Sequence, residues 1–342
     1  MVGRLAGWSG KGIKIGVIDD FTANDASDFL SIPISTGCST RYIQSTPIST
    51  CSNSNMILIK ATHGQQVAMI AGGSVSNFNG LIAESGGWSD SIDLGSYNIV
   101  KNLEINFSQP FYGVAKDASI YRNDFLTYQS NTSGLFYVLK DWGVGSNSSS
   151  NTYRTLKVLN MSLGGTSTNR VSNQYLYSNQ LSYANSSTVP DIVFVKAAGN
   201  NSCVISQTNC DPLNAVFFNS PNYKNKTIIV GALNQAGGNI ANYSNKAGSY
   251  SDIFLVADGR GFYNSTLNSY DEGTSFAAPR VSGYAAILRQ KFPNLNAEKS
   301  VSIMLDTARY DTLGCFPNCD PTIYGKGEAS LSRALAPVGR LR

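Results

Sequence analysis

The chain contains one histidine, His63, and three other segments supply groups with which an imidazole could do chemistry. Asp19 ends an apolar run, Asn200 follows a run of small residues, and Ser275 comes just before an alanine-rich stretch. A carboxylate, an imidazole, a side-chain amide and a hydroxyl therefore occur in that order along the chain. This order is one of the known arrangements that join a serine nucleophile to its base and to the acid that orients the base.

Ser275 is the candidate nucleophile, and His63 is its candidate base. A serine hydroxyl is a weak nucleophile unless a base lies beside it. The run after Ser275 predicts a helix, whose unpaired N–H groups and dipole would favour negative charge near this serine. His63 would take the serine proton and return it to a leaving amine, because an imidazole titrates near neutrality. A capping serine and a structural histidine are the alternatives, and the presence of all four groups favours catalysis.

Asn200 is the candidate group for stabilising negative charge during the reaction. Its side-chain amide would donate a hydrogen bond to the oxyanion of a tetrahedral intermediate, beside the backbone N–H of Ser275. An asparagine in a turn is the alternative, because the Gly-Asn-Asn sequence around Asn200 also suits a turn. The Ala-Ala-Gly run directly before Asn200 favours the role of donor.

Short apolar runs predict the strands that must position these groups. The runs are nearly continuous rather than alternating, which is typical of strands buried on both faces of a parallel sheet. Helical patterns lie between several of them, at residues 63–71, at residues 274–288, and in a third helix that Asn296 would cap. This alternation predicts an α/β fold: a doubly wound, mostly parallel sheet with helices on both faces. The predicted strands are residues 13–18, 118–121, 158–161, 192–195, 228–230 and 253–256.

Polar stretches rich in Ser, Asn and Tyr interrupt the predicted elements, as in residues 146–151 and 168–187. We expect them to be surface loop insertions rather than separate domains. Residues 1–342 are therefore predicted to form a single domain with a core of about residues 10–335.

The four segments resemble those of the subtilisin family of serine endopeptidases, the subtilases, in the family's own order and over nearly the whole chain. Residues 113–118 resemble the segment that leads into a central strand, residues 158–165 the strand that lines the substrate cleft, and residues 227–232 the strand after the oxyanion asparagine. The resemblance implies an enzyme that hydrolyses peptide bonds of protein or peptide substrates through an acyl-enzyme on Ser275. It implies no cofactor for the chemistry.

The resemblance also assigns roles to particular residues. Adjacent residues of a strand point to opposite sides, and the family pattern favours Asp19 over Asp20 as the acid that holds His63. Asn200 matches the oxyanion donor, whose loss costs on the order of 10²–10³ in kcat, a magnitude established on subtilisin itself. Two segments of mostly small residues would frame the substrate pocket, although small residues also let elements pack closely. These residues are Ser162, Leu163, Gly164, Ala197, Ala198 and Gly199.

Departures from the family pattern limit what the resemblance transfers. Gln65 and Gln66 replace a usual Thr-His pair after His63, and Lys196 stands where a small apolar residue is usual. Side-chain specificity is therefore not carried over. Subtilases often bind structural calcium, but the acidic candidates show no diagnostic ligand spacing, so no calcium site is assigned. These candidates are Asp25, Asp28, Asp90 and Asp93.

The six cysteines fall into three close pairs, and each pair would close a short loop. Local pairing is our hypothesis, and it indicates an oxidising compartment. Zinc binding is the weaker alternative, because the chain has no Cys-x-x-Cys and its only histidine has another role. The pairs are Cys38 with Cys51, Cys203 with Cys210, and Cys315 with Cys319.

The composition favours an exported globular protein. Hydrophobic residues make up 42% of the chain and aromatic residues 11%, which supplies a core and argues against disorder. Charged residues are only 14%, and the net charge of +4 is scattered, so we expect no nucleic-acid partner. No apolar run reaches the length of a membrane span. We expect a secreted or cell-surface protein that passes through the periplasm; the oligomeric state is not predicted.

The two ends of the chain predict neighbouring segments. Residues 1–5 are too short for a signal peptide, so we expect an excised catalytic domain without its export signal and propeptide. Residues 324–339 resemble the closing segment of subtilases carried by Gram-negative autotransporters, which suggests a further passenger region and a translocating barrel after Gly339. The polar insertions between the strands motivate a second hypothesis, a cell-surface, adhesin-like passenger whose catalysis serves mainly its own processing.

Overall fold

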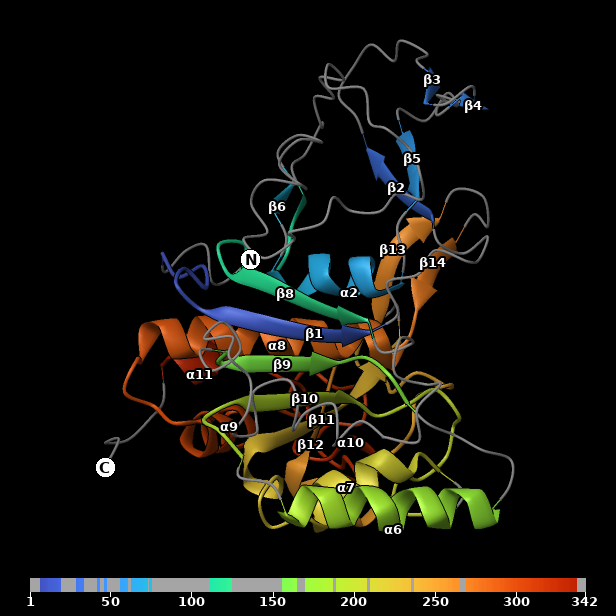
Figure 1. The fold of residues 1–342 in the computed structure, drawn as a ribbon, viewed down its shortest axis with the longest axis vertical. Helices are drawn as coiled ribbons and strands as arrows, with labels where there is room; N and C mark the ends of the chain where they lie inside the picture. Colours follow the sequence, from blue (N-terminus) through green and yellow to red (C-terminus); the bar gives the residue numbers. More distant parts are fainter. Residues whose placement is uncertain are drawn as a thin grey trace.

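A parallel sheet, helices on both of its faces and several small two-stranded antiparallel sheets make up the described part of the chain (Figure 1). The computed structural model describes residues 7–19, 29–33, 42–43, 46–47, 56–60, 63–72, 74–75, 111–124, 156–164, 170–186, 189–207, 210–234, 237–264 and 269–336.

The central sheet has six strands, and each pair of neighbours is parallel. The strands are β1 (Lys14–Asp19), β8 (Ser119–Asp124), β9 (Val158–Met161), β10 (Val193–Ala197), β11 (Thr227–Leu233) and β12 (Phe254–Asp258). Their order across the sheet is β12-β11-β10-β9-β1-β8. All six predicted strands are present, displaced by no more than three residues at either end. The near-continuous apolar sequence is explained by burial, since every residue of β9, β10 and β11 is buried.

Helices cover both faces of this sheet, which confirms the predicted doubly wound α/β fold (Figure 1). One face carries α2 (His63–Gly72), α8 (Thr274–Lys291), α9 (Ala297–Asp306) and the short α11 (Leu331–Leu335), and the other carries α6 (Arg170–Ser186) and α7 (Pro212–Asn219). As predicted, Asn296 caps α9, because its side chain accepts a hydrogen bond from the backbone N–H of Lys299 at 2.9 Å.

Alternation along each strand builds a separate core on each face. In β10, Val193 and Val195 pack with α8, whereas Phe194 points to the other face and packs its ring against Phe217 and Tyr223. The helix α8 lies against five strands of the central sheet and has alanine at most of its core positions. These short side chains bring the helix backbone close to the sheet, so the position of its first turn is set by packing.

One prediction about a polar stretch is wrong. Residues 168–187 were expected to be a loop insertion, but residues 170–186 form α6. The reason is a narrow stripe of buried positions in an otherwise polar sequence. Gln180 and Ala184 are fully buried, and Tyr177 and Leu181 pack against the same core as α7. These positions recur at spacings of three and four, which is the period of a helix.

Small two-stranded antiparallel sheets accompany the central sheet. They pair β2 (Phe29–Pro33) with β5 (Met56–Lys60), β3 (Tyr42–Ile43) with β4 (Thr46–Pro47), β6 (Ser74–Val75) with β7 (Phe111–Tyr112), and β13 (Arg260–Asn264) with β14 (Ser269–Glu272). Short helical turns complete the description: η3 (Lys224–Lys226), η4 (Gly248–Ile253) and α10 (Pro321–Tyr324). Of the helices described, none is both long and apolar enough to cross a bilayer.

The direction of winding reverses beside β1. The chain pairs β8 on one side of β1 and then returns to place β9 on the other side. In an α/β sheet, the crevice at such a switch point, outside the carboxyl ends of the strands, is where ligands bind. Asp19 is the last residue of β1, and Ser162 is the first residue after β9. The fold therefore brings two of the predicted site segments to this edge.

Candidate active site

Asp19 and His63 meet at the carboxyl edge of the sheet. The Oδ1 atom of Asp19 lies 2.5 Å from Nδ1 of His63. The aspartate side chain is only 2% exposed, whereas the imidazole is 38% exposed. A carboxylate can only accept, so Nδ1 carries the donated proton and Nε2 is left to accept one. The geometry is that of a base held in one tautomer by a buried acid.

Ser275 occupies the first turn of α8, where it contacts Ser162, the residue directly after β9. Its hydroxyl donates to the main-chain carbonyl of Ser162 at 3.4 Å, and the Ser162 hydroxyl donates to the main-chain carbonyl of Ser275 at 2.8 Å. The residue before this turn is Gly273, which has no side chain to cap the helix. Because Ser275 lies in the first turn of α8, it is close to the positive end of the helix dipole.

Packing between α2 and α8 brings His63 near the turn that carries Ser275. The ring centroids of His63 and Phe276, the residue after Ser275, are 5.7 Å apart. Further along α8, a Cβ atom added to Gly283 would lie 2.7 Å from the carbonyl oxygen of Ala71 in α2. Only a glycine allows the two helices to come this close. The helices that carry His63 and Ser275 are thus held together at both ends of their contact.

Asn200 lies in the loop after β10 and reaches the start of α8. Its Oδ1 atom accepts from the backbone N–H of Thr274 and from the Thr274 hydroxyl, both at 2.9 Å. The backbone N–H of Thr274 can only donate, so the Asn200 amide atom facing it is the oxygen and Nδ2 is turned away from Thr274. A Cβ atom added to Gly273 would be 3.3 Å from Asn200 Nδ2 and 3.6 Å from the backbone nitrogen of Ser275. Two N–H donors therefore converge on one small region beside Ser275.

A buried chain of hydrogen bonds runs from the middle of α8 to Ser275. The Ser282 hydroxyl donates to Asn160 Oδ1 at 2.9 Å, and Asn160 Nδ2 donates to the Ser162 hydroxyl at 2.9 Å. The Ser162 hydroxyl in turn donates to the Ser275 carbonyl. Sequence reasoning missed Asn160 and Ser282. The available signal was an asparagine in an otherwise apolar strand, because a fully buried amide needs partners.

The six predicted pocket residues lie at the carboxyl ends of the neighbouring strands β9 and β10. Ser162, Ala197 and Ala198 are buried, Leu163 and Gly199 are partly exposed, and Gly164 is exposed.

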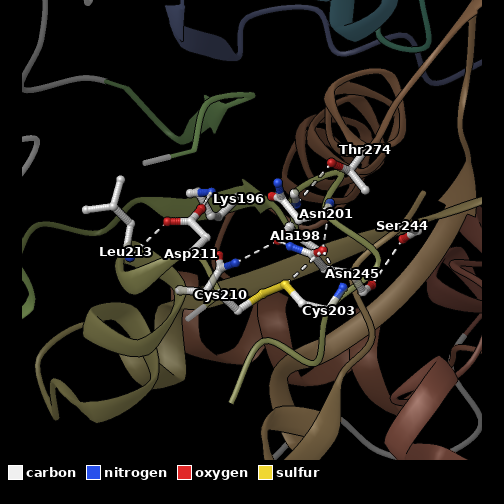
Figure 2. The surroundings of a disulfide bond; sticks show 12 residues. Lys196, Ala198, Asn201, Cys203, Cys210, Asp211, Leu213, Ser244, Asn245 and Thr274 are labelled. Carbon is white, nitrogen blue, oxygen red and sulfur yellow. Dashed lines mark hydrogen bonds and ion pairs between the residues drawn. A yellow bond between two sulfur atoms is a disulfide. The ribbon is translucent and has the colours of Figure 1, made fainter. Parts of the chain in front are cut away.

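Lys196 departs from the subtilase pattern and proves to be half of a buried ion pair. Its Nζ atom lies 2.9 Å from Asp211 Oδ2, and the two side chains are 0% and 1% exposed (Figure 2). The same ammonium donates to the Ala197 carbonyl at 2.7 Å, and Asp211 also accepts from the backbone N–H of Leu213 at 3.0 Å. A Cβ atom added to Gly164 would lie 3.0 Å from Asp211 Oδ2. This pair therefore lies directly behind both pocket segments.

Disulfides join two of the predicted cysteine pairs, Cys203 with Cys210 and Cys315 with Cys319. The third pair, Cys38 and Cys51, lies outside the described residues, as does Asp20. The acidic calcium candidates Asp25, Asp28, Asp90 and Asp93 lie outside them too. Within the part of the chain that the structure describes, no group of three or more His, Cys, Asp or Glu side chains is arranged to hold a metal ion.

Comparison with known proteins agrees with the fold. A family model described as the subtilase family, peptidase S8, matches residues 10–328. Subtilisin DY of Bacillus licheniformis is 30% identical over 231 residues, which are 65% of this chain and 70% of that protein. The fold and these matches define the class as serine protease. The chain belongs to the subtilase family.

Solved structures show the same fold. A protease from Pseudoalteromonas arctica superposes with a TM-score of 0.51 at 20% identity, covering 98% of this chain and 92% of that one. A serine protease of Aeromonas sobria superposes with a TM-score of 0.53 at 20% identity, covering 98% of this chain and 62% of that one. The second likeness leaves more than a third of the Aeromonas sobria chain unmatched, so it concerns the peptidase fold alone.

Proposed function

We propose that this chain is a serine endopeptidase in which Asp19, His63 and Ser275 form a catalytic triad. The observation that carries the proposal is the 2.5 Å contact between the buried carboxylate of Asp19 and Nδ1 of His63. It leaves Nε2 as the proton acceptor, in an imidazole whose ring lies near the turn that bears Ser275. The mechanism that follows uses only these side chains and the groups around them.

In the first half of the reaction, the Ser275 oxygen attacks the carbonyl carbon of the scissile bond while its proton moves to His63 Nε2. The hydroxyl must leave the Ser162 carbonyl to do so, and this exchange is easy because a hydrogen bond of 3.4 Å is weak. The Asp19 carboxylate stabilises the imidazolium that results. The imidazolium then protonates the leaving amine, the C–N bond breaks, and an ester on Ser275 remains.

In the second half, a water molecule attacks the ester carbonyl and gives a proton to His63 Nε2. Collapse of this second tetrahedral intermediate releases the carboxylic acid, and the imidazolium returns the proton to the Ser275 oxygen. In both halves, negative charge develops on the carbonyl oxygen of the substrate. Asn200 Nδ2 and the backbone N–H of Ser275 are the proposed donors to it, and one such donor is worth about 10²–10³ in kcat.

The substrate is proposed to be an extended segment of a protein. Main-chain groups at residues 162–164 lie at the rim of the sheet, where an added strand can form hydrogen bonds. The side chain before the scissile bond would enter between this segment and residues 197–199. The polypeptide substrate is thus held by its backbone, with one side chain directed between the two pocket segments, behind which the buried pair of Lys196 and Asp211 lies.

The proposed enzyme works outside the cytoplasm. Two disulfides are present among the described residues, and disulfides persist in oxidising compartments. Neither half of the proposed reaction needs a cofactor.

Labelling and hydrolysis together test the proposed function. Purified protein should react with a fluorophosphonate at Ser275 and should degrade casein, whereas Ser275→Ala and His63→Ala should each abolish casein hydrolysis while circular dichroism shows an intact fold. Failure of the wild-type protein to label, under conditions that mark other serine hydrolases, would point to a scaffold without catalysis. Substantial hydrolysis by His63→Ala would show that another group acts as the base.

A further inference from the structure

One buried side chain forms several hydrogen bonds with the main chain of the loop that carries Asn200. Asn245 lies in the segment after β11 and is fully buried. Its Oδ1 atom accepts from the backbone N–H of Asn201 at 2.9 Å and from that of Cys203 at 3.1 Å, and its Nδ2 atom donates to the Ala198 carbonyl at 2.8 Å (Figure 2). The side chain therefore binds the loop on both sides of Asn200.

The backbone of the same residue adds a further contact. The N–H of Asn245 donates to the Gly199 carbonyl at 2.9 Å. Gly199 has a φ angle of +101°, and a Cβ atom added to it would lie 2.5 Å from Asn245 Nδ2. The loop thus has a glycine at the one point where the amide approaches most closely. Asn245 contacts groups of residues 198, 199, 201 and 203, while Asn200 itself is exposed.

A disulfide bond holds the outer side of the loop. Cys203 is bonded to Cys210, and the next residue, Asp211, forms the buried pair with Lys196 in β10 (Figure 2). The loop therefore leaves the sheet at Ala197 and is tied back to the sheet through Asp211. Asn245 fills the space that this closed loop encloses on its inner side, as its contacts with the Ala198 carbonyl and the Cys203 N–H show.

We propose that Asn245 is a positioning residue for the oxyanion donor, acting through Asn200. The inference rests on the proposed function, because it takes Asn200 as that donor. A preformed donor stabilises the transition state only where its N–H already points at the developing charge. Asn200 has one anchor outside its own loop, at Thr274. Asn245 is the side chain that binds the loop main chain on both sides of Asn200, and without it we expect the Asn200 amide to move relative to Ser275.

The test is a double-mutant cycle between Asn245 and Asn200. Rates are measured on a quenched-fluorescent peptide chosen by cleavage-site profiling, and kcat is normalised to the fraction of sites that a fluorophosphonate labels at completion. Asn245→Ala should lower kcat on the order of 10- to 100-fold with KM changed by less than about threefold, since misplacement affects the transition state most. In an Asn200→Ala background, the same substitution should lower kcat by less than about threefold further.

A matched control separates positioning from a general loss of packing. Asn214 is also fully buried and also donates from Nδ2 to the Ala198 carbonyl, at 2.8 Å, but it does not bridge to the N–H groups of Asn201 and Cys203. Asn214→Ala should lower the melting temperature to a similar degree and lower kcat by less than about threefold. Should Asn245→Ala not fold, Asn245→Asp serves instead, because it keeps the acceptor for Asn201 and loses only the donor to Ala198.

The outcomes distinguish this proposal from the one on which it rests. If Ser275→Ala hydrolyses the peptide, the proposed function itself is wrong. If Ser275→Ala is inactive but Asn245→Ala has a kcat near that of the wild-type protein, Asn245 has no positioning role. Full additivity of the Asn245 and Asn200 substitutions, or an equal loss of kcat in Asn214→Ala, would also overturn it.

Discussion

Ser162 and Ser275 exchange hydrogen bonds, each hydroxyl donating to the other residue's main-chain carbonyl, at 2.8 Å from Ser162 and 3.4 Å from Ser275. The shorter bond continues the buried chain through Asn160 to Ser282. The longer bond is the one that the proposed reaction must break. The pair therefore joins the end of a strand to the start of a helix through one strong and one weak contact, and the weak contact belongs to the proposed nucleophile.

The strong contact can be tested by removing the Ser162 hydroxyl. In Ser162→Ala, the Ser275 carbonyl loses its donor and Asn160 Nδ2 loses its acceptor. We expect kcat to fall on the order of tenfold, and the free energy of unfolding to fall by about 1–3 kcal/mol because a buried donor is left unsatisfied. Kinetics on a peptide substrate and urea denaturation measure the two effects. Ser282→Ala, at the far end of the hydrogen-bond chain, should destabilise the fold with a loss in kcat below about threefold. An unchanged kcat in Ser162→Ala would contradict the expectation.

The two described disulfides should differ in their effect on activity. Cys203–Cys210 closes the loop next to Asn200, whereas Cys315–Cys319 lies in the segment before α10. Because both loops are short, loop-closure entropy predicts that either loss destabilises the fold by about 2–2.5 kcal/mol. Only replacement of Cys203 and Cys210 by serine should also lower kcat, because it frees the loop that carries the oxyanion donor. Equal kcat values for the two double-serine variants, at equal stability loss, would argue against a role for that loop.

The buried pair of Lys196 and Asp211 should show strong coupling in stability. Asp211→Ala leaves an ammonium group fully buried without its carboxylate, and we expect a loss of about 3–5 kcal/mol in the free energy of unfolding. The double variant Lys196→Met, Asp211→Ala should be less destabilised than Asp211→Ala alone, because an apolar pair carries no desolvation cost. Guanidinium denaturation of the single and double variants measures this cycle. A double variant as unstable as the sum of the two single variants would show that the pair is not coupled.

Acid should weaken the attachment of α8 and α9 to the sheet through Asp191. Burial alone would raise the pKa of the Asp191 carboxyl, but hydrogen bonds from Arg289 and Lys157 outweigh it and hold the pKa below the ordinary value of 3.8. A carboxyl with a lowered pKa in the folded state stabilises the fold above its unfolded pKa, and this contribution is lost as pH falls through the folded value. Stability should therefore decline as pH falls below about 4. In Asp191→Asn that decline should be shallower when unfolding is followed from pH 5 to pH 2.5, and an identical slope would rule out this linkage.

Much of the fold was predictable because the signals for strands and helices are local. The strands were predicted within three residues, since near-continuous apolar runs reflect burial on both faces. The Asn296 cap was predicted from one residue type at a helix start. The helix α6 was missed because its buried stripe includes Gln180 and Tyr177, which a hydrophobic pattern does not count as apolar.

The sequence by itself determined which chemical groups the site contains and in what order they occur, because residue types and the ends of local elements are properties of short segments. Only the tertiary structure decided which buried polar groups meet. Asn160 and Ser282 are 122 positions apart, Asn201 and Asn245 are 44 apart, and Lys196 and Asp211 are 15 apart. Such pairs form only if two packed elements place their atoms within a window of about 0.5 Å. No local pattern encodes that window, because it depends on how a helix and a sheet pack over their whole contact.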